Sequence, residues 1–285
     1  MENKFKIPVF LHDPKAQGGI AVRRFSQFDK QEYKHISKTH RDKCYILTVL
    51  TSGNLTILCD TLNIKLKSTD VFILKPLQVY SVITNSHNLD AYLFCIEPFL
   101  LPNYCFDIFQ NLTLNQQYVK IPEEQKNNIL DTSSLLFRAF QEDIPNKTFV
   151  IKGLLDSLIS RVAAFFMSSE NYTIESKNQA YALTSNFKKK LAENLLFHKP
   201  TFFAEKLNVT TSHLNDCVKS TTGFSLTYWL QDTIIREAKR NLYYTNKNIK
   251  EIAYDLGFED HTYFSRLFKN ITKETPLSFR NKFRE

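Results

Sequence analysis

The basic side chains of this chain are concentrated in its last third, where they could bind a polyanion. From residue 181 to residue 285 the sequence holds 17 Lys and Arg against 11 Asp and Glu, a net charge of +6. The first 180 residues hold the remaining 20 and 18, a net charge of +2. Such a surplus favours nucleic acid or another anionic surface as partner of the C-terminal part, although it predicts nothing about fold.

A motif that occurs twice in this basic region predicts how the charges are presented. Ala204-x-x-Leu207-Asn208-Val209 recurs 49 residues later as Ala253-x-x-Leu256-Gly257-Phe258. The small Ala lets two helices approach, Gly257 takes a positive φ at little cost, and Asn208 is the next most tolerant residue. Helix, tight turn and helix is the geometry in which the second helix enters the DNA major groove. A helical hairpin repeated only for packing is the alternative.

Helices must position both copies of the motif. Apolar spacing predicts seven of them, at 183–197, 202–207, 211–221, 226–244, 249–256, 261–272 and 277–282. Asn248 and Glu251 form a capping-box pattern, and Thr210 and Asp260 are predicted N-caps. The helix over 226–244 spans about 27 Å. With its turns it can separate two recognition helices by about 34 Å, one turn of DNA.

The N-terminal part has a different texture. Short segments rich in β-branched and aromatic residues, separated by turn formers, lie at 20–25, 44–50, 55–59, 71–74, 79–84 and 91–96. They predict a sandwich or a small barrel, which can enclose a ligand-sized cavity. Helical spacing follows at 123–142 and 149–166, and these two helices cover the barrel or pair with a second subunit. The polar segment 171–179 is the predicted linker.

The cysteines and the termini point to a reducing compartment. Five cysteines without C-x-x-C spacing predict buried reduced thiols, and neither a disulfide framework nor a zinc site. The N-terminus has no apolar leader, and no apolar run approaches the roughly 18 residues of a membrane helix. We therefore expect a cytoplasmic protein with no membrane partner.

At this point a resemblance becomes specific. The elements Ile-Ala-x-x-x-Gly-Phe from Ile252, Tyr-Phe-Ser-Arg-x-Phe-Lys from Tyr263 and Pro-x-x-Phe-Arg from Pro276 resemble the second helix-turn-helix of the AraC/XylS family of bacterial transcription regulators. Residues 204–223 and 228–242 are similar to the family's first motif and linker helix, so the resemblance covers about 183–283. The sequence departs from the family at Asn208, where Gly is usual, and at 272–274, where Thr-Gly is frequent.

Carried onto this sequence, the resemblance implies base-reading positions on two recognition helices. They are His261, Thr262, Ser265 and Arg266 in the second helix, and Ser212, Asn215 and Asp216 in the first. Arg266 is the leading reader, because a guanidinium binds guanine O6 and N7 bidentately; a phosphate contact or an ion pair with Glu259 is the alternative. Asn215 suits adenine, whereas Asp216 could accept from cytosine N4 but otherwise repels phosphate.

Other positions of the two helices receive positioning or packing roles. The predicted phosphate contacts, which position the protein without reading sequence, are Lys250, Lys269, Lys219 and Arg280. For each lysine, a solvated surface charge is the alternative. The predicted core-facing side chains of the second recognition helix are Tyr263, Phe264, Leu267 and Phe268.

The resemblance also implies an effector-binding barrel of the cupin type at 35–97. Ser68-Thr69-Asp70 lacks the family's Pro-Gly before Asp, and Tyr80 stands where many cupins have His. The candidate effector contacts are His40, Arg41, Tyr45, Phe72, Tyr80 and Tyr92, with a filled core or a surface position as the alternative. The scattered histidines predict no metal site and no cofactor.

Together these observations predict an α+β chain with two domains. A cupin-like β-barrel with two following helices occupies 1–178, with a dimerisation part at 122–170. An all-α seven-helix domain follows at 179–285, with helix-turn-helix motifs at 202–222 and 249–272. The predicted protein is no enzyme. It is a homodimeric, sequence-specific regulator that binds double-stranded promoter DNA, a small-molecule effector and RNA polymerase. The alternatives are a cupin-type metal enzyme with an appended helical domain and an effector-independent regulator.

Overall fold

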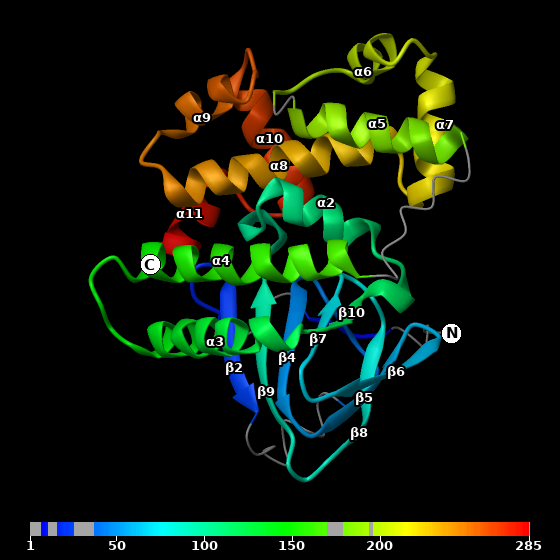
Figure 1. The fold of residues 1–285 in the computed structure, drawn as a ribbon. Coiled ribbons are helices and arrows are strands. Elements are labelled where there is room, and N and C mark those ends of the chain that lie inside the picture. The colour runs from blue at the N-terminus through cyan, green and yellow to red at the C-terminus, as the bar shows by residue number, and fades with distance from the viewer. Residues whose placement is uncertain (1–6, 11–15, 26–36, 170–178, 194–195, 285) are drawn as a thin grey trace, which may run out of the picture. The chain divides into compact units, whose positions relative to one another are not determined.

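The chain divides into two compact units, residues 1–173 and 174–285 (Figure 1). The computed structural model describes residues 7–10, 16–25, 37–169, 179–193 and 196–284. The N-terminal unit combines sheets with helices and the C-terminal unit is helical, which confirms the predicted mixed architecture. Residues 171–178 of the predicted linker lie outside the described residues, whereas Gln179, its last residue, begins a helix.

Two sheets form the body of the N-terminal unit. The five-stranded sheet has the order β10-β7-β4-β9-β2, with β10 at Tyr118–Lys120, β7 at Asp70–Leu74, β4 at Tyr45–Ser52, β9 at Asp90–Ile96 and β2 at Ile20–Phe25. The three-stranded sheet has the order β6-β5-β8, with β6 at Leu62–Lys67, β5 at Asn54–Cys59 and β8 at Tyr80–Asn85. A short parallel pair joins β1 (Val9–Phe10) to β3 (Arg41–Asp42).

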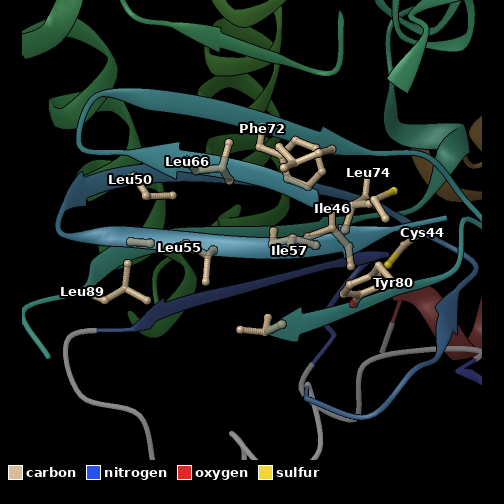
Figure 2. Packing of buried hydrophobic residues seen from close by; sticks show 14 residues of the cluster. Cys44, Ile46, Leu50, Leu55, Ile57, Leu66, Phe72, Leu74, Tyr80 and Leu89 are labelled. Carbon is tan, nitrogen blue, oxygen red and sulfur yellow. The ribbon is translucent and has the colours of Figure 1, made fainter. Parts of the chain in front are cut away.

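An apolar core lies between the two sheets (Figure 2). Alternate residues supply it because successive side chains of a strand point to opposite faces. Ile46 and Phe72 come from the larger sheet, and Ile57 and Leu66 from the smaller one. Among the described strands the hydrogen-bonded ladders do not run around one closed barrel. The predicted cupin-like barrel is therefore not closed by hydrogen bonds among these strands, and the two facing sheets correspond to the sandwich, the other predicted arrangement.

A disulfide joins two neighbouring strands and corrects the prediction of reduced thiols. Cys44 and Cys95 are bonded, with their Cα atoms 5.8 Å apart. Ile46 pairs with Cys95 across β4 and β9, so the residue two positions earlier lies within reach on the same face. Cys59, Cys105 and Cys217 are buried thiols, as predicted. Burial raises the pKa of Cys59 to about 12 and that of Cys105 to about 11, so neither is a thiolate at neutral pH.

Among the described residues, three α-helices belong to the N-terminal unit. They are α2 at Asn103–Asn111, α3 at Lys126–Gln141 and α4 at Lys147–Ser168. The predicted helical pair corresponds to α3 and α4, which pack against each other (Figure 1), while α3 also contacts β2 and β4 of the larger sheet. The helices thus cover the face of that sheet opposite the core of Figure 2. Neither α2 nor β10 was predicted from the sequence.

The C-terminal unit is built around one long helix. Its elements are α5 at Gln179–Glu193, α6 at Pro200–Lys206, α7 at Thr211–Thr222, α8 at Leu226–Tyr244, α9 at Ile249–Asp255, α10 at His261–Thr272 and α11 at Pro276–Arg284. Figure 1 shows α6 and α7 toward one end of α8 and α9 toward the other. At 19 residues, α8 is about 28 Å long. Among the described helices, none has the length and apolar composition needed to span a bilayer.

Candidate nucleic-acid interface

The two predicted motifs have the same backbone. In each, a short helix ends in one residue at positive φ, which is Asn208 at 53° in the first motif and Gly257 at 82° in the second. The next residue turns back onto the small Ala: Val209 N donates to Ala204 O at 3.0 Å, and Phe258 N donates to Ala253 O at 3.0 Å. Asn208 therefore occupies the left-handed region despite its side chain, as the sequence predicts.

The second recognition helix, α10, presents a polar face over an aromatic core. The Asp260 carboxylate accepts from the N–H groups of Thr262 and Tyr263, which fixes the start of the helix. The buried side chains of this helix are Phe264, Leu267 and Phe268, as predicted. Tyr263 is 44% exposed and touches Phe258 only at the rim of the core, so its predicted inward orientation is wrong.

The predicted base-reading positions of α10 share the exposed face. His261, Thr262 and Arg266 are exposed, whereas Ser265 is half-buried and donates from Oγ to His261 O at 2.9 Å. Within the described part of the chain, Arg266 makes neither a hydrogen bond nor an ion pair, and the alternative pairing with Glu259 is not formed. Its five N–H donors are therefore available to an external acceptor.

The first recognition helix, α7, differs in chemistry. Ser212 and Asp216 are exposed at the positions that match Thr262 and Arg266. Asn215 is half-buried, and its Oδ1 accepts a 3.1 Å hydrogen bond from the N–H of Leu226 in α8. The paired donor and acceptor that would recognise adenine are thus not both available in this arrangement.

The predicted phosphate contacts fall into two groups. Lys219 and Lys269 are exposed on the recognition helices, and Lys250 is exposed at the start of α9 with its Nζ 5.8 Å from the centroid of the Tyr254 ring. Arg280 is half-buried instead. Its Nε donates to Leu242 O at 3.3 Å and its other nitrogen to Lys247 O, so it holds the end of α8 and the following loop. Two of its nitrogens are thus engaged within the fold, which argues against the predicted phosphate contact.

Sequence reasoning missed two exposed side chains on the same faces. His213 and Tyr263 occupy matching positions, three residues before Asp216 and Arg266 respectively. Residues three apart on a helix are neighbours on its surface, and this spacing was the signal that could have identified them. His213 lies within 3.9 Å of the buried Cys217 sulfur.

The candidate effector residues are not brought together at one place. Phe72 and Tyr80 belong to the core between the sheets (Figure 2). Tyr45 and Tyr92 lie on the opposite face of the larger sheet. There Tyr45 accepts from Gln110 Nε2 of α2 at 2.5 Å, and Tyr92 lies 5.9 Å from the Phe137 ring of α3. A single pocket lined by these four aromatic side chains is therefore not present.

A compact polar group remains at one end of this core. The Tyr80 hydroxyl donates to Asp42 Oδ2 at 2.5 Å, and the His40 ring lies 4.3 Å from the Tyr80 ring and 3.6 Å from the same carboxylate oxygen. Burial, followed by the Asp42 charge, raises the pKa of Tyr80 well above its ordinary value, so it stays protonated. Arg41 is half-buried on β3. No three His, Cys, Asp or Glu side chains cluster in metal-binding fashion among the described residues.

Comparison with known proteins matches the C-terminal unit. A family model described as a helix-turn-helix domain matches residues 203–282. The transcriptional activator RhaS of Mannheimia succiniciproducens is 39% identical over 77 residues, 27% of this chain and 29% of that protein. The arabinose operon regulatory protein of Escherichia coli K12 is 34% identical over 77 residues, 27% of this chain and 26% of that protein.

Two further similarities have a lower identity. Histidine kinase P4 of Formosa agariphila is 30% identical over 83 residues, which are 29% of this chain and 6% of that protein. The chain thus spans less than a third of each of these relatives. The solved structure of ToxT from Vibrio cholerae covers 92% of this chain and 97% of that chain at 14% identity, with a TM-score of 0.38.

Proposed function

We propose that the chain is a regulator of the AraC/XylS type that binds promoter DNA and regulates transcription, because a helix-turn-helix family model and two bacterial regulators match its C-terminal unit. The observation that carries the proposal is the exposed face of α10, where Arg266 and Lys269 stand beside His261 and Thr262 with no acidic residue on the helix. Guanidinium, ammonium and hydroxyl groups on one helix face match phosphates and the acceptors of base edges. A DNA-binding role would place the protein in the cytoplasm.

We assign base reading mainly to α10. Arg266 would bind guanine O6 and N7, and His261, Thr262 and Ser265 would contact neighbouring bases. Ser212 and Asp216 give α7 weaker means of reading, because a carboxylate near the backbone repels phosphate. Lys219, Lys250 and Lys269 would hold phosphates, whereas Arg280 is occupied inside the fold.

We assign control of DNA binding to the N-terminal unit. A small-molecule effector would bind near the polar group formed by His40, Asp42 and Tyr80, next to the apolar core between the sheets. A ligand can act as a switch only if it binds the DNA-competent and incompetent arrangements with unequal affinity. The alternative is a regulator without an effector, in which this unit only assembles subunits. In that case no small molecule should shift the unfolding temperature of the chain.

We propose that α4 pairs two copies of the chain. Phe149 and Met167 on this helix are 64% and 55% exposed, and a Cβ added to Gly153 between them would meet no atom within 4 Å. No described part of the chain comes close enough to require the glycine, although it costs a helix about 1 kcal/mol. A Phe149→Asp variant should be monomeric in sedimentation at concentrations where the wild type dimerises. A transcription regulator would further require RNA polymerase as a partner.

Binding of the full chain to duplex DNA tests the proposal. The chain should bind a random duplex with an affinity that falls steeply as salt rises, and a selected duplex more tightly. Arg266→Ala should remove the preference for one base pair. Absence of binding at any salt would refute the DNA-binding role. Stoichiometric iron or zinc in the purified protein would favour the rival function, a metal enzyme of the cupin type.

A further inference from the structure

The junction between α7 and α8 contains a hydrogen bond with an unusual acceptor. Leu226 is the first residue of α8, and the first N–H groups of a helix have no partner inside that helix. The Ser225 hydroxyl oxygen accepts from Tyr228 N at 3.2 Å, as an N-cap does. The N–H of Leu226 donates to Oδ1 of Asn215, whose side chain comes from the recognition helix α7. The start of α8 is therefore capped partly by α7.

In the second copy of the motif, the matching junction between α10 and α11 lacks this hydrogen bond. Fifty residues after Leu226 the sequence has Pro276, the first residue of α11. Proline has no N–H and fits the first helical position without an acceptor. Fifty residues after Asn215 the sequence has Ser265, whose hydroxyl donates to His261 O within its own helix. The copy whose next helix begins with an N–H donor, Leu226, thus has Asn at position 215. The copy whose next helix begins with Pro276 has Ser at the matching position 265.

A second contact fastens α7 to α8 near the other end of α7. Trp229 Nε1 donates to the Thr222 hydroxyl at 2.9 Å, and the Trp229 side chain is buried. With Asn215, this gives α7 one attachment in its first half and one at its last residue. Apolar side chains such as Leu214 and Val218 bury one face of α7, and the two directional hydrogen bonds add a defined orientation on α8 to that packing.

We infer that Asn215 is a positioning residue that sets α7 on the end of α8, and that it does not read a base. The inference rests on the proposed DNA binding. Two recognition helices engage neighbouring major-groove segments only when about one helical turn separates them, so a loosened α7 lowers affinity for the two-segment site. The segment read by α10 is affected little, because Asn215 acts through α7 alone.

A double-mutant cycle tests the hydrogen bond in the DNA-free full chain. Asn215→Ala should lower the unfolding temperature, because it leaves the Leu226 N–H unsatisfied. The same substitution in a Leu226→Pro background should have almost no further effect, whatever Leu226→Pro costs by itself. Equal effects of Asn215→Ala in both backgrounds would overturn the inference.

Two duplexes test the positioning role, at a temperature where every variant is folded. One is the duplex that the wild-type chain selects from a random pool; the other is truncated to the segment whose preference Arg266→Ala changes. Asn215→Ala should weaken binding to the longer duplex by about 2- to 10-fold, the free energy of one hydrogen bond, and leave the truncated duplex unaffected. If Asn215 only stabilised the fold, Asn215→Ala would leave the ratio of the affinities for the longer and the truncated duplex unchanged. That result would overturn the inference.

Single-base changes in the longer duplex separate positioning from reading. Asn215→Ala should weaken binding to every member of the series by the same factor. Loss of preference at one A·T pair alone would show that Asn215 reads adenine and would overturn the inference. If the wild-type chain bound no duplex, the proposed function would fail, while the unfolding cycle would still report on the hydrogen bond.

Discussion

The two helix-turn-helix motifs of the C-terminal unit share a backbone and differ in the groups they present to solvent. Each turns through one residue at positive φ and closes on a buried Ala. On α10 the exposed face carries Arg266 and Lys269, whereas the matching positions of α7 are Asp216 and Lys219. One fold can therefore support a strong reader and a weak one, because backbone geometry and surface chemistry are set by different residues.

The starts of the two recognition helices also differ. Asp260 caps α10 with a carboxylate that accepts from two N–H groups, while Thr210 caps α7 with a hydroxyl that accepts from His213 N alone. The short helix before α10 has a full capping box, from Asn248 and Glu251, and α6 begins without a side-chain cap. Local interactions therefore hold the second motif more tightly. The following predictions test this contrast, from the largest expected effect to the smallest.

Substitutions at the positive-φ residue of each turn should give the largest difference between the motifs in the free energy of unfolding. Gly257→Val places a β-branched side chain at φ +82°, with its Cβ 3.2 Å from Phe197 N, and should destabilise the chain by about 2 kcal/mol or more. The matched change Asn208→Gly relieves the first turn and should stabilise the chain by less than about 1 kcal/mol. Chemical unfolding measures both. Changes in the free energy of unfolding that are equal in size and opposite in sign at the two turns would contradict this difference between the motifs.

Base reading should be lost from only one of the helices. Arg266→Ala should remove about 1–3 kcal/mol of discrimination at one base pair. Asp216→Ala should instead raise affinity for every sequence by a small factor, because it removes a negative charge from the interface. Competition binding with duplexes that carry single-base changes measures both effects. A base-specific loss in Asp216→Ala as large as that in Arg266→Ala would show that α7 reads equally well.

Much of this contrast could be predicted from sequence, because local residues determine it. The start of α10 follows from Asp260 as its cap, and the bounds of α8 follow from helical apolar spacing. The role of Asn215 could not be predicted, because it depends on an N–H eleven residues away. Arg280 was likewise assigned to phosphate, although carbonyl groups in another part of the fold occupy it.

In the N-terminal unit the sequence was less informative, because both faces of the larger sheet are buried. Tyr45 and Phe72 alternate with residues that are equally apolar, so the pattern does not reveal which side chains meet between the sheets. Cys44 and Cys95 are 51 residues apart, and only the register of β4 with β9 brings them together. The three-residue β10 gives no periodic signal at all.

Two basic residues of the second motif should respond differently to salt. Lys269→Ala should weaken binding to all sequences alike and reduce the slope of log affinity against log salt by about 1, because one phosphate contact is lost. Arg280→Ala should leave that slope unchanged and lower stability by about 1 kcal/mol, because the carbonyl groups of Leu242 and Lys247 lose their donor. Salt titrations and thermal unfolding distinguish the two. A reduced slope in Arg280→Ala would show that Arg280 contacts a phosphate, as the sequence predicts.

Acid should weaken the start of α10 and spare that of α7. The N–H of Thr262 hydrogen-bonds to the Asp260 carboxylate and lowers its pKa below the ordinary 3.8. Because the pKa is lower in the folded chain, this stabilisation is present above pH 3.8 and is lost as pH falls through the folded value. Asp260→Asn keeps a capping group that does not titrate. Unfolding temperatures of wild type and variant should therefore converge or cross below pH 4, and parallel curves would contradict this role.

Selection of duplexes from a random-sequence pool by the full-length chain tests the central claim most directly. The claim is that the chain reads DNA through two helix-turn-helix motifs of unequal strength. The enriched sequences should contain one sharply defined segment, which Arg266→Ala blurs, and a weaker segment about one helical turn away. Two segments of equal definition would contradict the inequality, and a pool that stays random would contradict sequence-specific DNA binding itself.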